Sequence, residues 1–352
     1  MNRESFDSIL VIAPSWVGDV VMATPAIRSL RHQFPNASIT VLVRPTGADV
    51  LEHNPHIDRV IAASREGIGP QVRSTRHLVR LLRAESFDLA VILPNSFRSA
   101  LLAWRARART RVGYRAQWRS PLLTERVPPP RENGKVVPIN MVERYLTLCA
   151  RVGCADLSTK EELFASDQDR AAATAALSAL GVEEGDRLAV LIPGASYGPS
   201  KRWGAASFAE VGDALIERHG LKVLAHVGPG EEEIGRQVTT LSTRGVRVAP
   251  PGVIDLKVLK SVIGRSVLVV SNDTGPRHYA VAYDVPNVAI LGPTSRRYID
   301  VNLEHTTLLQ AKVACGPCQL KVCPRDHRCM TLIEPGQVIK AAEDLLAVAP
   351  DK

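Results

Sequence analysis

The sequence lacks long hydrophobic runs. Its 352 residues contain no window of the roughly 20 apolar residues that a membrane-spanning helix requires. The first apolar run, residues 9–13, is also too short for the core of a signal peptide. We therefore expect a cytoplasmic protein. Its hydrophobic content of 45% and charged content of 23% are typical of folded proteins, and its length predicts two domains.

The common nucleotide-binding signatures are also missing. No Walker A motif is present, which argues against a P-loop enzyme. Gly228-Pro-Gly230 lacks the third glycine of the Rossmann fingerprint, so a nicotinamide cofactor is poorly supported. Asp167 and Asp169 form a D-x-D pattern at the start of an expected helix, where we expect capping rather than magnesium binding. No sequence repeat indicates a solenoid.

Short apolar runs alternate with helical periodicity along the chain. This alternation predicts an α/β fold with doubly wound parallel sheets. The expected strands are residues 9–13, 39–43, 60–62, 89–93, 188–192, 222–227, 267–270 and 288–291. The clearest expected helices are residues 72–84, 141–152, 168–180, 208–218, 231–241, 256–263, 276–283 and 335–346.

Between Cys154 and Asp169 the periodicity fades into polar residues, which we interpret as a hinge. We expect Rossmann-like domains at residues 1–165 and 166–334, facing each other across a cleft. The C-terminal segment 335–352 is expected to pack back on the first domain. In such sheets, ligands bind beyond the carboxyl ends of the strands, so the loops at those ends are the candidates for function.

The turn after the first strand carries Asp19. Pro14 ends the strand, Gly18 lies in the turn, and apolar residues then recur at helical spacing. Asp19 could be the N-cap of the helix. Alternatively, Thr24 is the cap with Pro25 in the first turn, which leaves Asp19 in the loop beside the expected crevice.

A loop in the second half, residues 191–203, follows another expected strand and contains Gly194, Ser196 and Lys201. Backbone N–H groups in such a turn, together with the mobile charge of Lys201, suit a diphosphate. A surface loop with solvated charges is an equally good interpretation.

The loop Asp273-Thr274-Gly275 lies at a further strand end. Gly275 permits close backbone approach, and free N–H groups at a helix start favour a phosphate. Asp273 or Thr274 could instead cap the helix. His278, expected on the inner face of that helix, is more typical of a core histidine than of a catalyst, and we keep it as a donor-binding candidate.

Glu231 and Glu232 follow the strand expected at 222–227. They are typical of an acid-rich first helical turn, which the helix dipole favours. One of these carboxylates could accept hydrogen bonds from ribose hydroxyls, as acidic residues do in dinucleotide sites.

Positive charge is concentrated in one segment of a chain whose formal net charge is +8. Nine arginines between Arg98 and Arg131 are interleaved with Trp104, Tyr114 and Trp118, against the single acid Glu125. This concentration predicts a surface for an anionic partner, although a solvated face is the alternative. A nucleic-acid-binding protein is the rival from another class, but no recognised nucleic-acid module is visible.

The cysteines cluster near the C-terminus. Cys315, Cys318, Cys323 and Cys329, with His327, lie within fifteen residues, a density that suits a structural Zn ion or an iron–sulfur cluster. The spacing is not that of an ordinary zinc ribbon, and disulfides are disfavoured in a cytoplasmic chain. Reduced thiols in a loop are the better-supported interpretation.

Three motifs at strand ends together resemble those of the lipopolysaccharide heptosyltransferases of glycosyltransferase family nine, most closely the heptosyltransferase II type. They begin at Ser15 (S-W-V-G-D-V-V-M-A-T-P-A), Pro193 (P-G-A-S-Y-G-P-S-K-R-W) and Ser271 (S-N-D-T-G-P-R-H). The resemblance runs nearly from end to end. It implies the GT-B architecture. It also implies that the enzyme transfers L-glycero-D-manno-heptose from ADP-heptose to the inner core with inversion, as the second heptose, and that it needs no catalytic metal or cofactor.

The resemblance also implies roles for individual residues. Asp19 matches the catalytic base, Lys201 the diphosphate-binding lysine, and Asp273-Thr274-Gly275 the donor-binding loop. Glu231 or Glu232 would contact the adenosine ribose. The cysteine-rich tail occurs in only some members, which argues against a catalytic role for it.

The acceptor implied by the resemblance is Kdo-lipid A or heptosyl-Kdo-lipid A, at the cytoplasmic face of the inner membrane. Arg98, Arg115 and Arg119 would then bind this acidic acceptor and hold the enzyme peripherally at the bilayer, with no nucleic-acid partner. A GT-B transferase with a UDP or GDP donor is the alternative enzyme.

Overall fold

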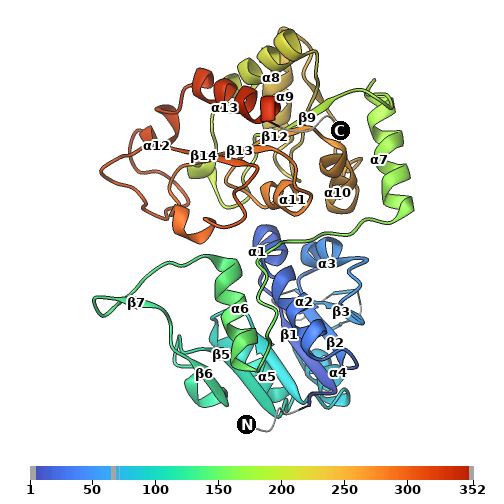
Figure 1. The fold of residues 1–352 in the computed structure, drawn as a ribbon, viewed down its shortest axis with the longest axis vertical. Coiled ribbons are helices and arrows are strands. Elements are labelled where there is room, and N and C mark those ends of the chain that lie inside the picture. The colour runs from blue at the N-terminus through green and yellow to red at the C-terminus, as the bar shows by residue number, and fades with distance from the viewer. Residues whose placement is uncertain (1–4, 65–68, 71, 349–352) are drawn as a thin grey trace. The chain divides into compact units, whose positions relative to one another are not determined.

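The computed structural model describes residues 5–64, 69–70 and 72–348 and divides into two compact units (Figure 1). The first unit contains the described residues through Phe164, with Arg297–Val301. The second contains Ala165–Arg296 and the described residues from Asn302 onward. The division after Phe164 lies beside the boundary expected at residue 165. The outer ends of the expected domains, residues 1–4 and 349–352, lie outside the described residues.

A six-stranded parallel sheet forms the centre of the first unit, with strand order β3-β2-β1-β4-β5-β6. The strands are β1 (Ser8–Ile12), β2 (Ser38–Val43), β3 (Arg59–Ala62), β4 (Leu89–Ile92), β5 (Thr110–Tyr114) and β6 (Glu125–Val127). β1 and β4 consist almost entirely of buried apolar residues, as expected for strands covered on both faces. This order is that of a Rossmann-like sheet. Successive strands are added on one side of β1 up to β3 and on its other side from β4 onward, so the switch point lies between β1 and β4.

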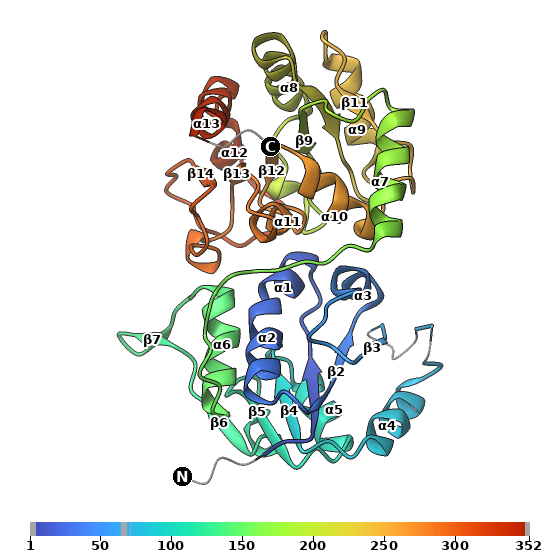
Figure 2. The ribbon, with the colours of Figure 1, turned by 45° about the vertical axis from the view of Figure 1, so that its right-hand side comes forward.

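Helices cover both faces of the first sheet (Figure 2). They are α1 (Val17–Met22), α2 (Thr24–Gln33), α3 (Pro45–Leu51), α4 (Thr75–Ala84), α5 (Phe97–Arg105) and α6 (Met141–Arg151). Leu10 and Ile12 of β1 pack in a core with α4 and α5. Because side chains alternate along a strand, Ile9 and Val11 point to the opposite face, where α2 packs against α6.

The second unit repeats this plan. Its six parallel strands have the order β11-β10-β9-β12-β13-β14. The strands are β9 (Leu188–Ile192), β10 (Lys222–Ala225), β11 (Arg247–Val248), β12 (Leu268–Asn272), β13 (Asn287–Leu291) and β14 (Thr306–Gln310). The switch point in the strand order lies between β9 and β12, so the loops after these two strands flank the expected ligand position.

The helices of the second unit form two layers. They are α7 (Asp167–Ala179), α8 (Ala205–His219), α9 (Glu232–Leu241), α10 (Leu256–Arg265), α11 (Arg277–Ala282), α12 (Arg328–Thr331) and α13 (Pro335–Val348). One layer contains α7, α10 and α11, and the other contains α8, α9, α12 and α13 around Phe208 and Met330. Ser166 and Asp169 form a capping box at the start of α7, which confirms the expected capping role of the D-x-D pattern.

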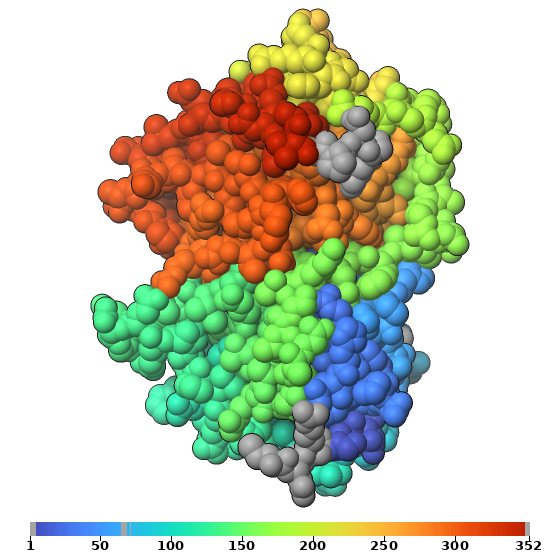
Figure 3. Space-filling view, in the orientation of Figure 1, coloured from blue at the N-terminus to red at the C-terminus, as the bar shows by residue number. Residues whose placement is uncertain are grey.

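One sequence-based expectation needs correction. α13, expected to pack back on the first domain, belongs to the second unit, where Val338, Ile339 and Ala342 pack in the core with α8. In Figure 3 its red residues lie against the orange residues of the same unit. In the first unit, β6 is followed by a short antiparallel hairpin, β7 (Arg131–Glu132) and β8 (Lys135–Val136), because Asn133-Gly134 forms a tight turn.

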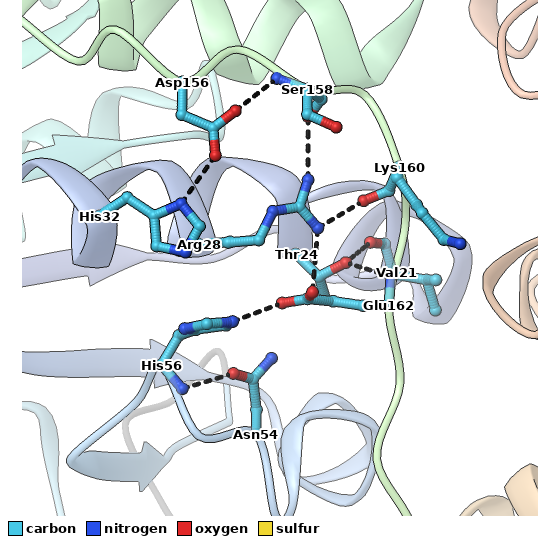
Figure 4. A network of polar contacts seen from close by, with 10 residues as sticks. All are labelled: Val21, Thr24, Arg28, His32, Asn54, His56, Asp156, Ser158, Lys160 and Glu162. Atoms are coloured by element: carbon cyan, nitrogen blue, oxygen red, sulfur yellow. Dashed lines mark hydrogen bonds and ion pairs between the residues drawn. The ribbon is translucent and has the colours of Figure 1, made fainter.

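The segment that follows α6 is held on α2 rather than free (Figure 4). Arg28 donates to the carbonyls of Ser158 and Lys160 and pairs with Glu162 at 2.9 Å. His32 lies 2.7 Å from Asp156. These contacts restrict the expected hinge to the few residues between Glu162 and the start of α7.

Across the described ranges 5–64, 69–70 and 72–348, no helix is both long and apolar enough to cross a bilayer.

Candidate active site

Asp19 lies within the first turn of α1, beyond the carboxyl end of β1. Trp16 is the N-cap of α1, and α2 begins separately at Thr24 with Pro25 near its start, so Asp19 is neither a cap nor a loop residue. Its side chain is half-buried, and the preceding Gly18 is buried. Burial, and then the negative charge of Asp19, raises the pKa of Tyr145 on α6 well above its usual value. A carboxylate therefore lies near the buried face of α6 at the switch point of the first sheet.

Lys201 and Asp273 meet across the switch point of the second sheet. Lys201 ends the short 3-10 helix η2 (Pro199–Lys201) after β9, and Asp273 follows β12. The Lys201 ammonium lies 2.6 Å from Asp273 Oδ2 and donates to the Asp273 carbonyl at 3.1 Å. Thr294 donates to the same carboxylate oxygen at 2.5 Å. The two loops proposed from sequence to bind a diphosphate are therefore in direct contact.

The pKa of Asp273 reflects this contact. Burial alone would raise the pKa of the carboxyl, but the nearby Lys201 ammonium and the Thr294 hydroxyl outweigh burial and hold it below its usual value. Lys201 also lies 5.0 Å from the centre of the Tyr197 ring, a cation–π distance. The side chain of Lys201 is thus held in place by a carboxylate and an aromatic ring of the second unit.

The sequence suggested that the backbone N–H groups after β12 could bind a phosphate, but the N–H of Asp273 already has a partner within the sheet. The Asp273 N–H donates to the Ile290 carbonyl at 3.0 Å and continues the sheet ladder. α11 begins only at Arg277 and has six residues, so it contributes a short dipole. Thr274 and Gly275 are half-buried in the connecting turn, and His278 is buried on α11.

Glu231 joins three segments of the second unit. Its side chain is buried, and Oε1 accepts the Ala195 N–H at 2.8 Å while Arg202 donates to it at 3.2 Å. Oε2 accepts the Gly228 N–H at 3.3 Å. Gly194 makes this approach possible, because a Cβ at that position would overlap the Glu231 carboxylate. Glu231 therefore holds the loop after β9 against the loop after β10.

Glu232 and Ser196 are placed differently from Glu231. Both are exposed, and Glu232 accepts the Gly230 N–H at 2.9 Å, which lowers the pKa of its carboxyl. Of the two glutamates considered for ribose, Glu232 is the accessible one and Glu231 is engaged within the fold.

Residues 319–327 support the loop that carries Lys201, a role that sequence analysis missed. The carbonyls of Gln319 and Leu320 accept the hydroxyls of Tyr197 at 2.6 Å and Ser200 at 2.5 Å. His327 Nε2 lies 2.7 Å from the Ser200 carbonyl. A Cβ on Gly198 would overlap the backbone of residue 321, so this close contact depends on a glycine there. No sequence signal pointed to this contact between loops 120 residues apart.

The cysteine cluster does not form a metal site. All six cysteines are free thiols, and the described residues include no group of three cysteine, histidine or acidic side chains that could hold a metal ion. Burial, and then neighbouring Cys323, Cys318 and Cys315, raises the pKa of the Cys329 thiol. The structural Zn or iron–sulfur site considered for Cys315, Cys318, Cys323 and Cys329 is therefore not supported.

The three arginines proposed for the acceptor lie in different environments. Arg98 on α5 and Arg115 after β5 are exposed. Arg119 is completely buried, and burial lowers its pKa to about 10. Its guanidinium donates to the carbonyls of Tyr114 and Pro94 and to the hydroxyl of Ser99. Arg119 therefore organises the loop after β4 from inside the fold instead of presenting a surface charge.

Two Rossmann-like units, one with a carboxylate and the other with a half-buried lysine at the switch point of its sheet, are the arrangement of the GT-B class of glycosyltransferases, which solved relatives share. The sequence profile described as glycosyltransferase family 9 (heptosyltransferase) matches residues 75–328. The chain therefore belongs to glycosyltransferase family 9.

Curated relatives match over most of their length. The chain is 29% identical to lipooligosaccharide heptosyltransferase 2 of Haemophilus ducreyi, with 96% of this chain and 99% of the relative covered. It is 30% identical to lipopolysaccharide heptosyltransferase 2 of Salmonella typhimurium, with 82% and 83% covered.

Solved structures agree with this membership. A glycosyltransferase family 9 protein from Veillonella parvula superposes with a TM-score of 0.84 at 25% identity, with 99% of both chains covered. ADP-heptose LPS heptosyltransferase II of Escherichia coli gives a TM-score of 0.78 at 27% identity, with 97% of this chain and 98% of that chain covered.

Proposed function

We propose that the protein transfers L-glycero-D-manno-heptose from ADP-heptose to the inner core of lipopolysaccharide, where it adds the second heptose. The observation that carries this proposal is the ion pair of the half-buried Lys201 with the buried Asp273 at the switch point of the second sheet, where a donor diphosphate is expected. Relatives named as heptosyltransferase 2 support the choice of sugar and acceptor.

In this proposal the second unit binds the donor. Lys201 supplies positive charge to the diphosphate as the bond to the sugar breaks and ADP leaves. Asp273 positions the lysine, Glu231 and Gly194 set the shape of the loop that carries it, and Thr274, Gly275 and His278 complete the donor side. Ser196 and Glu232 are the accessible polar groups for the phosphates and the ribose.

The first unit binds the acceptor. Asp19, preceded by Gly18, accepts the proton of the attacking hydroxyl, and a single displacement inverts the anomeric centre. Arg98 and Arg115 contact the acidic groups of Kdo-lipid A or heptosyl-Kdo-lipid A, while Arg119 acts through the loop that it organises. The enzyme works peripherally at the cytoplasmic face of the inner membrane, where such an acceptor resides.

Two measurements test the function. Thermal shifts with ADP, UDP and GDP should show the largest stabilisation with ADP, because a ligand that binds only the folded state raises its stability. Incubation with ADP-heptose and a heptosyl-Kdo acceptor should then yield a product one heptose heavier by mass spectrometry, also in the presence of EDTA. A preference for UDP or GDP, or no heptose transfer to any core acceptor, would refute the proposal.

A further inference from the structure

Large aromatic side chains are exposed on and beside α5 of the first unit. Phe97 and Trp104 on α5 are 45% and 52% exposed, and Trp118, in the turn after β5, is 95% exposed. Folded proteins usually bury most of such side chains, because each carries a large apolar area. Phe97, Leu101 and Trp104 follow the spacing i, i+4, i+7 and therefore share one face of the helix.

Arg119 holds the turn that carries Trp118 near the start of α5. Its guanidinium donates to the carbonyls of Pro94 and Ser96, three residues and one residue before Phe97. α5 also contacts the short 3-10 helix η1 (Ser120–Leu122) that follows this turn. Trp118 therefore emerges beside the N-terminal part of α5, which packs on β4 and β5 (Figure 2). We refer to Phe97, Leu101, Trp104 and Trp118 as the α5 surface.

The backbone of the turn adds a second observation. Gln117 and Trp118 have φ angles of 45° and 60°, in the left-handed region that residues other than glycine seldom adopt. The contacts of the adjacent, buried Arg119 hold this turn, whereas the indole of Trp118 is almost fully exposed and its own packing does not account for the conformation. Strain of this kind is typical of segments that serve a ligand or a partner.

The charges around the α5 surface are positive. Arg98 and Arg105 each follow an aromatic residue by one position on α5, and Arg115 precedes the turn of Trp118; all three are exposed. Tryptophan prefers the headgroup level of a bilayer, and arginine binds lipid phosphates while its stem lies along apolar surface. This combination fits an anionic membrane better than an apolar protein groove, which would not require the arginines.

We infer that the α5 surface docks the enzyme on an anionic phospholipid bilayer. Phe97, Trp104 and Trp118 lie at headgroup level, and Arg105 contacts lipid phosphates. Arg98 and Arg115 contact the acidic groups of the acceptor when it is bound and those of neighbouring lipids when it is not. β1 and β4 are adjacent parallel strands, so α5 starts at the same edge of the sheet as the loop of Asp19. An acceptor anchored in the bilayer would thus present its sugars at the edge where Asp19 lies. The inference rests on the proposed function in that the acceptor is a glycolipid.

Co-sedimentation of the full chain with vesicles tests the inference. Vesicles of phosphatidylglycerol and phosphatidylethanolamine should bind the protein at low salt, release it at high salt, and exceed phosphatidylcholine vesicles in binding. The double variant W104S/W118S should partition about tenfold less, since two interfacial indoles are lost. L241S/L332S is the control, because it removes from the second unit two large hydrophobic side chains that are 51% and 57% exposed.

Equal binding to anionic and zwitterionic vesicles, or unchanged binding of W104S/W118S, would overturn the inference. So would sedimentation velocity that shows a dimer dissociated by W104S/W118S, because the surface would then serve a second copy of the chain. Heptose transfer to a deacylated, water-soluble acceptor should be the same in W104S/W118S and wild type. If wild type transfers no heptose, the proposed function fails, and this outcome is distinct from loss of vesicle binding.

Discussion

Removal of the Lys201 ammonium leaves the Asp273 carboxylate buried without the cation that lies 2.6 Å away. Breaking a buried ion pair from one side usually costs about 3–5 kcal/mol of unfolding free energy. Thr294 still donates to Asp273, and the charge of Arg277 still favours its ionised form. We therefore expect Lys201→Met to destabilise the second unit by about 3 kcal/mol, at the lower end of that range.

Urea denaturation followed by tryptophan fluorescence measures this loss in the second unit. Trp203 is buried there, whereas Trp16, Trp104 and Trp118 in the first unit are already exposed, so most of the emission shift on unfolding comes from Trp203. If the free energy of unfolding falls by about 2 kcal/mol per molar urea, the urea midpoint of Lys201→Met should lie about 1.5 M below that of wild type.

A double variant separates the charge effect from simple loss of contacts. Lys201→Met combined with Asp273→Asn removes both charges, and we expect its stability to return to within about 1 kcal/mol of wild type. Turnover should stay low, because the diphosphate still lacks its cation. If the two substitutions destabilise additively, or if Lys201→Met shifts the midpoint by less than about 0.3 M, the pair is not the buried ion pair described above.

The same pair predicts a dependence on pH. Because the folded-state pKa of Asp273 is lowered, its carboxylate stabilises the fold fully above its unfolded pKa of about 3.9. That contribution is lost as the pH falls through the lower folded-state pKa. Lys201→Met should therefore lose stability less steeply than wild type below about pH 4, and equal slopes in acid titrations would contradict this account.

Three further substitutions test other parts of the site. Asp19→Asn should fold normally by circular dichroism but lower kcat by about 10²–10⁴-fold, and near-normal turnover would exclude Asp19 as the base. Glu231→Gln should raise the KM for ADP-heptose about tenfold with a smaller change in kcat, through weaker loop contacts, whereas the exposed control Glu233→Gln should not; equal KM values would contradict the positioning role. His327→Ala removes the contact with the Ser200 carbonyl and should weaken ADP binding about fivefold by calorimetry, whereas unchanged affinity would separate residues 319–327 from donor binding.

The central strands could be predicted from sequence because each is a buried apolar run. The expected strand at residues 188–192 coincides with β9. The expected strand at 9–13 differs from β1 by one residue at each end, and that at 89–93 differs from β4 by one residue at its C-terminal end. β5 was missed because Arg111 interrupts it and its two N-terminal residues are only half-buried. Edge and near-edge strands bury less apolar surface, so their periodicity is weaker.

That Lys201 and Asp273 lie close together could be predicted in part from a topological rule. Both residues lie in loops after strands, and loops after adjacent parallel strands open at the same edge of a sheet. That β9 and β12 are adjacent, however, depends on the order of strands in the folded sheet. The sequence placed both residues at strand ends, but their direct ion pair depends on that adjacency and on side-chain packing.

Arg119 shows where residue type alone is insufficient. It lies among nine arginines of the same segment, yet it is buried while Arg98 and Arg115 are exposed. The difference arises because the turn after β5 directs its side chain toward the carbonyls of the loop after β4. A cation in a charged stretch is ordinarily assigned to the surface, and only the fold reveals that this one has backbone partners.

The sequence left two roles open for Glu231, a contact with the ligand or a contact with another loop. A carboxylate at the start of a helix has the same local sequence whether it contacts a ligand or another loop. Here the deciding residue is Gly194, 37 positions upstream, since any side chain there would occupy the space of the Glu231 carboxylate. A glycine in one strand-end loop and an acid after the next strand thus form a single structural unit. Because the carboxylate already accepts N–H groups from both loops and a bond from Arg202, its effect on a donor passes through the shape of the loop that carries Lys201.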